Sequence, residues 1–92
     1  MATMNAGKVK GGEYLDTQLF INEVNLGALT VQPDDGDNTL RDAISSVESV
    51  SASFDSENNL VISSSGTLTI AGTIPYGVDN NTVGGLLPGV YD

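Results

Sequence analysis

The chain contains no cysteine, no histidine and no tryptophan, and only three of its 92 residues are basic. Without cysteine it has no disulfide, no thiol nucleophile and no thiolate metal ligand. Without histidine it lacks the side chain that most often moves protons near neutral pH and most often binds transition metals. These absences remove the reactive groups of most enzyme classes. We therefore expect a protein that is not an enzyme and that uses no cofactor.

The shortage of basic residues also limits the partners of the chain. Lys8, Lys10 and Arg41 stand against twelve acidic residues, which gives a formal net charge of -9. Nucleic-acid binding requires clustered Lys and Arg to neutralise phosphates, and a negative surface disfavours association with anionic membranes. We expect neither a nucleic acid nor a membrane as partner.

Long apolar runs are missing too. The longest run is far below the roughly 18 residues of a spanning helix, and the first four residues do not open a signal peptide. We expect a soluble chain with room for one small domain. A chain of this length buries only about 60 to 65% of its unfolded surface, so its core is expected to be marginal and partner contacts to contribute to its stability.

Residues 18–72 have the pattern of a small α+β domain. Five apolar residues predict two strands between residues 18 and 31: Phe20, Val24, Leu26, Leu29 and Val31. The turn between these strands is expected at Asn22-Glu23 or at Asn25 and Gly27. Pro33 cannot donate a ladder hydrogen bond, so the second strand should end before it.

A short helix is expected to begin within one residue of Thr39. Its apolar face has the spacing i, i+3, i+4 and i+7, in Leu40, Ala43, Ile44 and Val47. The candidates for the N-cap are Asp37, Asn38 and Thr39. Thr39 with Asp42 resembles a capping box in which Asp replaces the usual Glu. About two and a half turns would not be stable alone, so the apolar face must pack on a sheet.

Alternating residues predict two or three further strands after this helix. Val50, Ala52 and Phe54 alternate with polar residues, and the four residues 56–59 form a hairpin loop. Leu60 with Ile62, and then Leu68 with Ile70, continue the alternation. The predicted fold is a ββαββ(β) unit of the α+β class, with one short helix packed on a mostly antiparallel sheet.

The two ends of the chain are predicted to be extended arms, residues 1–17 and 73–92. The first is rich in glycine and has no sustained period; its alternative is a disordered terminus. The second is apolar without a period, so it is expected either to dock to a neighbour or to fold back over the open sheet face. The residues expected to contact neighbouring subunits are Lys8, Lys10, Leu86, Leu87, Val90 and Tyr91.

Clustered acids are the remaining candidates for chemistry. Asp34, Asp35, Asp37 and Asn38 offer oxygen ligands, but no register of this segment satisfies a calcium-binding EF-hand loop, and turn and cap roles explain the cluster better. Asp55 lies close to Glu57 in a predicted loop, where we expect solvent to keep the pKa of Asp55 ordinary. We therefore expect no catalytic, cofactor-binding or metal-binding residue.

Four segments, taken in order, resemble the flagellin hook IN motif. They are Phe20–Val24, Asp35–Ile44, Val50–Asp55 and Asn59–Ser64. The motif consists of an Ile-Asn-Gly turn, a helix ending in Ala-Ile-Asn, a Val-x-Ala-x-hydrophobic strand and a Leu-Val-Leu-Thr-Ser strand. The chain departs from it at Glu23, where the family has Gly, and at Ser45, where the family has Asn.

This resemblance implies a structural role, because flagellins, hook-associated proteins and some phage virion proteins carry the motif in outward-facing domains. The chain lacks the long terminal heptad helices by which flagellins polymerise. We therefore expect a non-enzymatic phage virion protein, a head decoration or tail-associated subunit, that docks to other structural subunits, its own copies included. The alternatives are an outer domain of a flagellin or hook-associated protein on the extracellular flagellum, and a small monomeric binding or adhesin module.

Overall fold

The computed structural model of the protein describes residues 1–9, 12–14, 19–71 and 89–92. The elements run in the order β1 (Ala2–Gly7), β2 (Gly12–Tyr14), β3 (Phe20–Ile21), β4 (Val24–Asn25), β5 (Leu29–Val31), the 3-10 turn η1 (Pro33–Asp35), α1 (Thr39–Ser45), β6 (Val50–Phe54), β7 (Leu60–Ser64), β8 (Leu68–Ala71) and β9 (Gly89–Tyr91). The strand pairs between them are antiparallel. The predicted α+β class, with one short α-helix and mostly antiparallel sheets, is confirmed.

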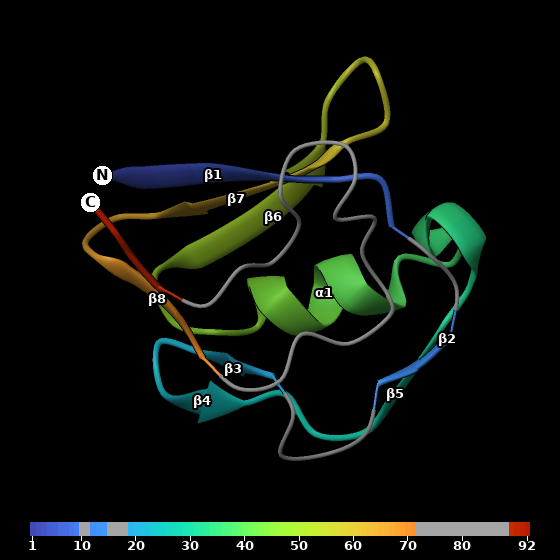
Figure 1. Ribbon diagram of the computed structural model, residues 1–92, viewed down its shortest axis with the longest axis horizontal. Coiled ribbons are helices and arrows are strands. Elements are labelled where there is room, and N and C mark those ends of the chain that lie inside the picture. Colours follow the sequence, from blue (N-terminus) through green and yellow to red (C-terminus); the bar gives the residue numbers. More distant parts are fainter. Residues whose placement is uncertain (10–11, 15–18, 72–88) are drawn as a thin grey trace.

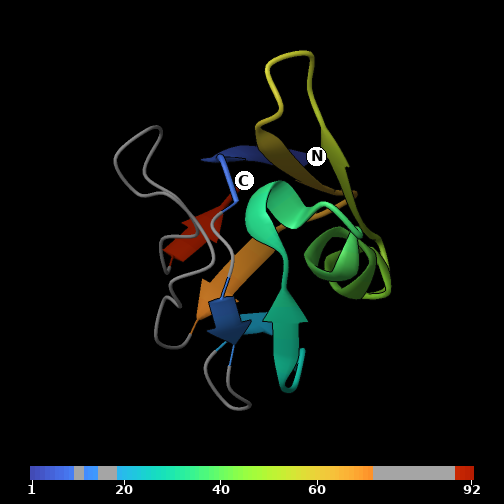
Figure 2. The ribbon, with the colours of Figure 1, turned by 90° about the vertical axis from the view of Figure 1, so that its right-hand side faces the viewer.

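Three small sheets surround the helix (Figure 1). One has the strand order β1-β7-β6, the second pairs β2 with β5, and the third has the order β4-β3-β8-β9. The chain passes from the first sheet to the third between β7 and β8. Figure 2 shows α1 nearly end-on, beside β6 and β5, which are the strands it packs against.

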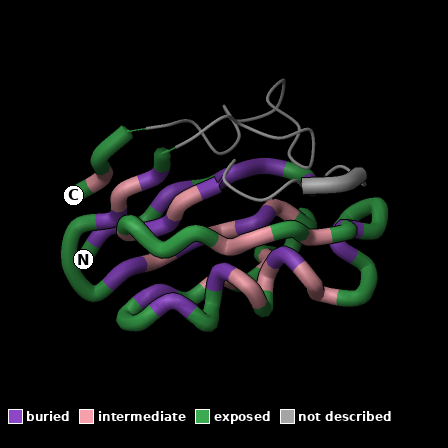
Figure 3. Tube along the Cα trace, turned by 90° about the horizontal axis from the view of Figure 1, so that it is seen from below, coloured by how far each residue is buried: buried purple, intermediate pink, exposed green. Residues whose placement is uncertain are grey.

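The core forms where the predicted apolar faces meet. Leu40, Ile44 and Val47 of the helix face are buried, and so are Leu60 and Ile62 of β7. Along the strands of the tube in Figure 3, buried residues alternate with exposed ones in β1 and with partly buried ones in β7, as a half-buried sheet requires. The predicted helix start and the alternation in β6 and β7 are confirmed.

The N-terminal segment differs from the predicted arm. Residues Ala2–Gly7 form β1, which pairs with β7 from Ala2 opposite Ser64 to Gly7 opposite Leu60. The side chains of Ala2, Met4 and Ala6 are buried in the core. The described part of residues 1–17 therefore belongs to the folded body, because its inward-facing positions complete the first sheet.

The C-terminal end also joins the body. Gly89–Tyr91 form β9, which pairs with β8 in the register Leu68–Tyr91, Thr69–Val90 and Ile70–Gly89. Tyr91 is half-buried and packs against the core. For these last residues the structure agrees with the fold-back alternative. The rest of the predicted C-terminal arm lies outside the described residues.

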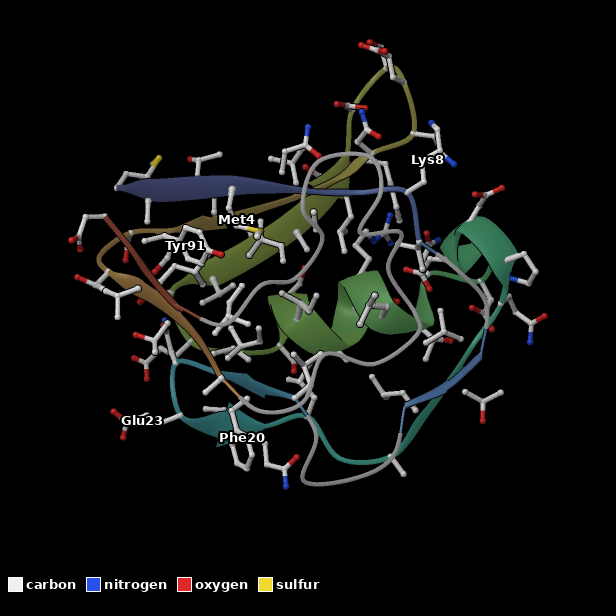
Figure 4. All side chains as sticks on the ribbon, in the orientation of Figure 1. Met4, Lys8, Phe20, Glu23 and Tyr91 are labelled. Atoms are coloured by element: carbon white, nitrogen blue, oxygen red, sulfur yellow. The ribbon has the colours of Figure 1, made fainter. Side chains whose placement is uncertain are left out.

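The turn between β3 and β4 lies at Asn22-Glu23, the first of the two predicted places. Both residues have positive φ, 48° and 69°, as a two-residue type I′ hairpin requires. The backbone N–H of Asn22 donates to the carbonyl of Thr69 at 2.8 Å, and the Asn22 Oδ1 accepts from the Thr69 N–H at 2.7 Å. The hairpin is thereby attached to β8. Figure 4 shows the Glu23 side chain pointing into solvent.

The start of α1 is held by a residue that was not among the predicted caps. Asp35 is 1% exposed, and its two carboxylate oxygens accept hydrogen bonds from the backbone N–H groups of Leu40 (2.9 Å) and Arg41 (2.8 Å). Asn38 occupies the N-cap position but makes no side-chain cap, and Asp42 forms an ion pair with Arg41 at 3.1 Å. The predicted Thr39–Asp42 capping box is therefore replaced by Asp35.

Removing the Asp35 carboxylate should destabilise the fold strongly. In Asp35→Ala, two helical N–H groups lose their acceptor, one of them buried, and we expect a loss of about 2 to 3 kcal/mol beyond the control. Asp34→Ala is the matched control, because Asp34 also has positive φ but is exposed. Urea unfolding measures both variants, and equal stabilities would contradict the capping role.

Replacing Glu23 by glycine should stabilise the protein. A left-handed conformation costs a non-glycine residue on the order of 1 kcal/mol, so Glu23→Gly is expected to raise the free energy of unfolding by about that amount. Glu48→Gly is the control: Glu48 is exposed without positive φ, and its replacement should lower stability by about 0.5 to 1 kcal/mol. In thermal unfolding, the melting temperature of Glu23→Gly should lie above that of Glu48→Gly. The reverse order would contradict the assigned turn.

Candidate functional site

Three of the six predicted docking residues lie in the described structure. They are Lys8, Val90 and Tyr91, whereas Lys10, Leu86 and Leu87 lie outside the described residues. Figure 4 places Lys8 and Tyr91 toward opposite ends of β1. The structure therefore does not bring the basic and the apolar docking residues together, and each must be considered separately.

Lys8 follows directly after β1 and is exposed. Its ammonium group donates a hydrogen bond to the backbone carbonyl of Glu57, in the loop between β6 and β7. Lys8 thus connects the end of β1 to this loop of its own chain. A partner acid could reach the exposed ammonium group, but it would compete with this internal bond.

The apolar docking residues lie on β9. Val90 is 65% exposed, whereas the neighbouring Tyr91 packs inward. Beyond the strand, the Thr67 hydroxyl donates to the Asp92 carboxylate at 3.0 Å. Met1, 88% exposed, precedes β1, and the chain ends lie near each other in Figures 1 and 2. Exposed apolar groups therefore stand at the corner where the start of β1 approaches β9.

The outer edge of β6 is occupied by a side chain of the helix. The Ser45 Oγ accepts a hydrogen bond from the Ala52 N–H at 3.0 Å and donates one to the Ala52 carbonyl at 3.4 Å. An edge strand normally presents such groups to incoming chains. Ser45 therefore closes the middle of β6 to strand addition. In the sequence Ser45 stands out only as a departure from the motif, because the position of β6 at the edge of its sheet follows from the strand order and not from a local pattern.

A surface pocket of about 390 Å³ opens where the β3–β4 turn, the α1–β6 connection and the β7–β8 connection meet. Its lining consists of Asn22, Val24, Val47, Glu48, Ser49, Ser64, Ser65, Gly66 and Thr67. The polar groups are hydroxyls, one amide and a single carboxylate, so the pocket can hold a polar molecule through hydrogen bonds. Sequence reasoning missed this pocket, because its lining comes from three separate connections.

The predicted acidic cluster serves the local fold. Asp35 caps α1, and the Asp37 Oδ1 accepts a hydrogen bond from the Thr39 N–H at 3.3 Å. Within residues 1–9, 12–14, 19–71 and 89–92, no three His, Cys, Asp or Glu residues are grouped so that they could hold a metal ion. The turn and cap role expected for the cluster as a whole is confirmed for these two residues, although Asp35, which makes the main cap, was not among the three N-cap candidates.

Asp55 organises the β6–β7 loop more strongly than expected. Its carboxylate accepts hydrogen bonds from the backbone N–H groups of Asn59 and Glu57, both at 2.9 Å, and from the Asn59 side-chain amide at 3.3 Å. The Asn59 backbone bond is the main cause that lowers the pKa of Asp55; the other two bonds and the Lys8 charge add to it, while desolvation opposes it. The expectation of an ordinary pKa is therefore wrong.

No protein-family model and no curated protein matches this chain. The resemblance to the hook IN motif accordingly stays a prediction. Among the helices of the described residues, none combines the length and the apolar character needed to cross a membrane.

An NMR titration should find the pKa of Asp55 below 3.8. Because the folded pKa is lower than the unfolded one, ionised Asp55 stabilises the fold above the unfolded value, and this contribution is lost as the pH falls through the folded pKa. Asp55→Asn should remove this pH dependence, whereas Glu57→Gln should leave it unchanged. A measured pKa at or above 3.8 would contradict the hydrogen-bonded loop.

Proposed function

We propose that the protein is a non-enzymatic structural subunit of a phage virion, a head decoration or tail-associated subunit. It docks to neighbouring subunits at the corner where the start of β1 approaches β9. The observation that supports this most is Val90, a large apolar side chain that is 65% exposed on a strand at the edge of its sheet. Edge strands that carry apolar side chains are common surfaces for adding a strand from another chain.

The size of the apolar contribution indicates the form of docking. Burying one valine side chain fully is worth about 1.5 kcal/mol, so Val90 together with Met1 supplies only part of a stable contact. Backbone pairing along the edge would have to supply much of the remainder. This favours strand addition over simple apolar contact.

The negative charge of the chain also fits a subunit held by specific contacts. With a net charge of -9, free copies repel one another in solution. Docking therefore depends on a defined surface, and the resemblance to the hook IN motif suggests an assembly in which such small domains face outward.

Two alternatives keep specific support. The order of turn, helix and strands suits an outer domain of a flagellin or hook-associated protein as well. The pairing of β9 with β8 suits a monomeric binding module, because there the C-terminal segment covers the core of its own chain.

Val90→Asp should prevent incorporation into the particle. Virions and flagellar filaments are purified from the phage or bacterium whose genome encodes the chain, and the chain in each is quantified by immunoblot. We expect it in virions, and we expect Val90→Asp to lower its amount at least tenfold, because a charge replaces the docking side chain.

Val24→Asp is the matched control, since Val24 is 46% exposed on β4, at the opposite edge of the same sheet. This variant should be incorporated normally. Presence of the chain in filaments only would favour the flagellar alternative. Its absence from both particles would overturn the proposed function.

A further inference from the structure

We propose that the pocket beside the β3–β4 turn binds a small organic cation, an ammonium or guanidinium group on a short apolar chain. The pocket has a volume of about 390 Å³, which lies toward the smaller end of the sizes found for ligand sites. This inference goes beyond the proposed function and does not rest on it, because the ligand is a free small molecule and not a neighbouring subunit.

Hydrogen bonds hold the walls of this pocket in place. The Ser65 N–H donates to the Ser49 carbonyl at 3.0 Å, which joins the β7–β8 connection to the α1–β6 connection. Asn22 attaches the third wall, the β3–β4 turn, to Thr69 of β8 through its backbone N–H and its side-chain Oδ1. A ligand therefore meets a preformed site, and little ordering of the chain opposes binding.

Three side chains of the pocket have polar groups that are not yet used. In the described part of the chain, the side chains of Glu48, Ser49 and Ser65 make no hydrogen bond or ion pair, and all three residues are exposed. The hydroxyls of Ser64 and Thr67, by contrast, already donate hydrogen bonds. A ligand in the pocket therefore meets one carboxylate and two hydroxyl oxygens, all of which can accept hydrogen bonds.

The charge around the pocket is negative. Its described lining contains the Glu48 carboxylate and no basic residue. A second carboxylate is close by, since Asp92 accepts a hydrogen bond from the Thr67 hydroxyl of the lining at 3.0 Å. Lys8 and Arg41, the basic residues of the described chain, make their bonds in other parts of the fold. Coulombic attraction therefore favours a cation in this pocket and disfavours an anion.

The pocket also offers apolar surface for a chain attached to the charge. Val24, 46% exposed, and the buried Val47 both contribute to the lining. Alkyl cations bury their methylene groups against such surface while the charged end bonds to acceptors. A guanidinium group is planar, and two of its N–H groups can donate to one carboxylate in parallel. An alkylguanidinium ion thus matches both the valines and the Glu48 carboxylate.

The backbone conformation supports a binding role independently. Seven described non-glycine residues have positive φ, and five of them are Asn or Asp, which adopt this conformation most readily. The other two are at the pocket: Ser49, with φ of 68°, belongs to the lining, and Glu23, with φ of 69°, lies between the lining residues Asn22 and Val24. Strained residues of this kind concentrate at ligand sites.

An NMR titration of the full chain with n-butylguanidinium tests the proposal. We expect saturable shifts of the backbone amides of Ser49, Ser65 and Thr67, with a dissociation constant on the order of 1 mM, because the ligand has few heavy atoms and one exposed ion pair. The neutral 1-pentanol should bind severalfold more weakly. The anion pentanoate should produce no saturable shift, because it is repelled by Glu48.

Glu48→Gln removes the charge with little change of shape, and we expect it to weaken binding of n-butylguanidinium by about fivefold, the upper range for an exposed ion pair. Glu57→Gln is the matched control: it changes the net charge equally, but Glu57 is exposed in the β6–β7 loop and is not part of the lining. This control should bind like the unmodified chain. Absence of saturable shifts, or equal binding by Glu48→Gln and Glu57→Gln, overturns the site. Equal binding of 1-pentanol overturns the cation as its ligand.

Incorporation into virions is a separate outcome. The lining residue Val24 lies on β4, at the opposite edge of the sheet from β9, so Glu48→Gln should be incorporated normally. If the cation binds but the chain is absent from virions, the site stands and the virion assignment is wrong. Loss of incorporation in Glu48→Gln would overturn the assignment to a free ion, because the pocket would then receive a group of a neighbouring subunit.

Discussion

The described structure depends on the buried carboxylate of Asp35. The α-helix is seven residues long and could not persist by itself, so its place is determined by the groups at its start and by the sheets it packs against. Asp35 accepts from two of its first N–H groups. Leu40 and Ile44 consequently enter the core between β5 and β6, and the strands on either side of the helix share one interior.

Much of this fold follows from local patterns. The period of 3.6 in the helix and the period of 2 in β6 and β7 identified those elements, because each buries one face. The hairpin at Asn22-Glu23 was one of two predicted positions, and the departure at Glu23 did not move it: Glu23 adopts the positive φ that glycine would favour. Here tertiary attachment to Thr69 outweighs residue preference.

Other parts could not be read in this way. β1 has the period of a strand, but of its four buried residues two are alanine and one is glycine, which give a weak hydrophobic signal, and the glycines nearby suggested an arm. Asp35 was identified as a turn residue, yet its capping role depends on the path of the chain through η1, where both Asp34 and Asp35 have positive φ. That path results from packing and not from residue spacing.

The candidate site likewise combines residues that the sequence indicated with features that depend on tertiary packing. The sequence named Val90 and Tyr91 together as candidate docking residues; the structure exposes Val90, whereas the inward packing of Tyr91 depends on a strand pair distant in sequence. The pocket beside the β3–β4 turn was beyond prediction, since it exists only where three connections converge.

The Ser45 hydroxyl on Ala52 has a consequence for the geometry of any larger structure. With the middle of β6 closed, chains cannot stack through this strand into a continuous cross-β ribbon. One small hydroxyl thus removes the edge of β6 from the surfaces through which copies of this domain could join by backbone pairing.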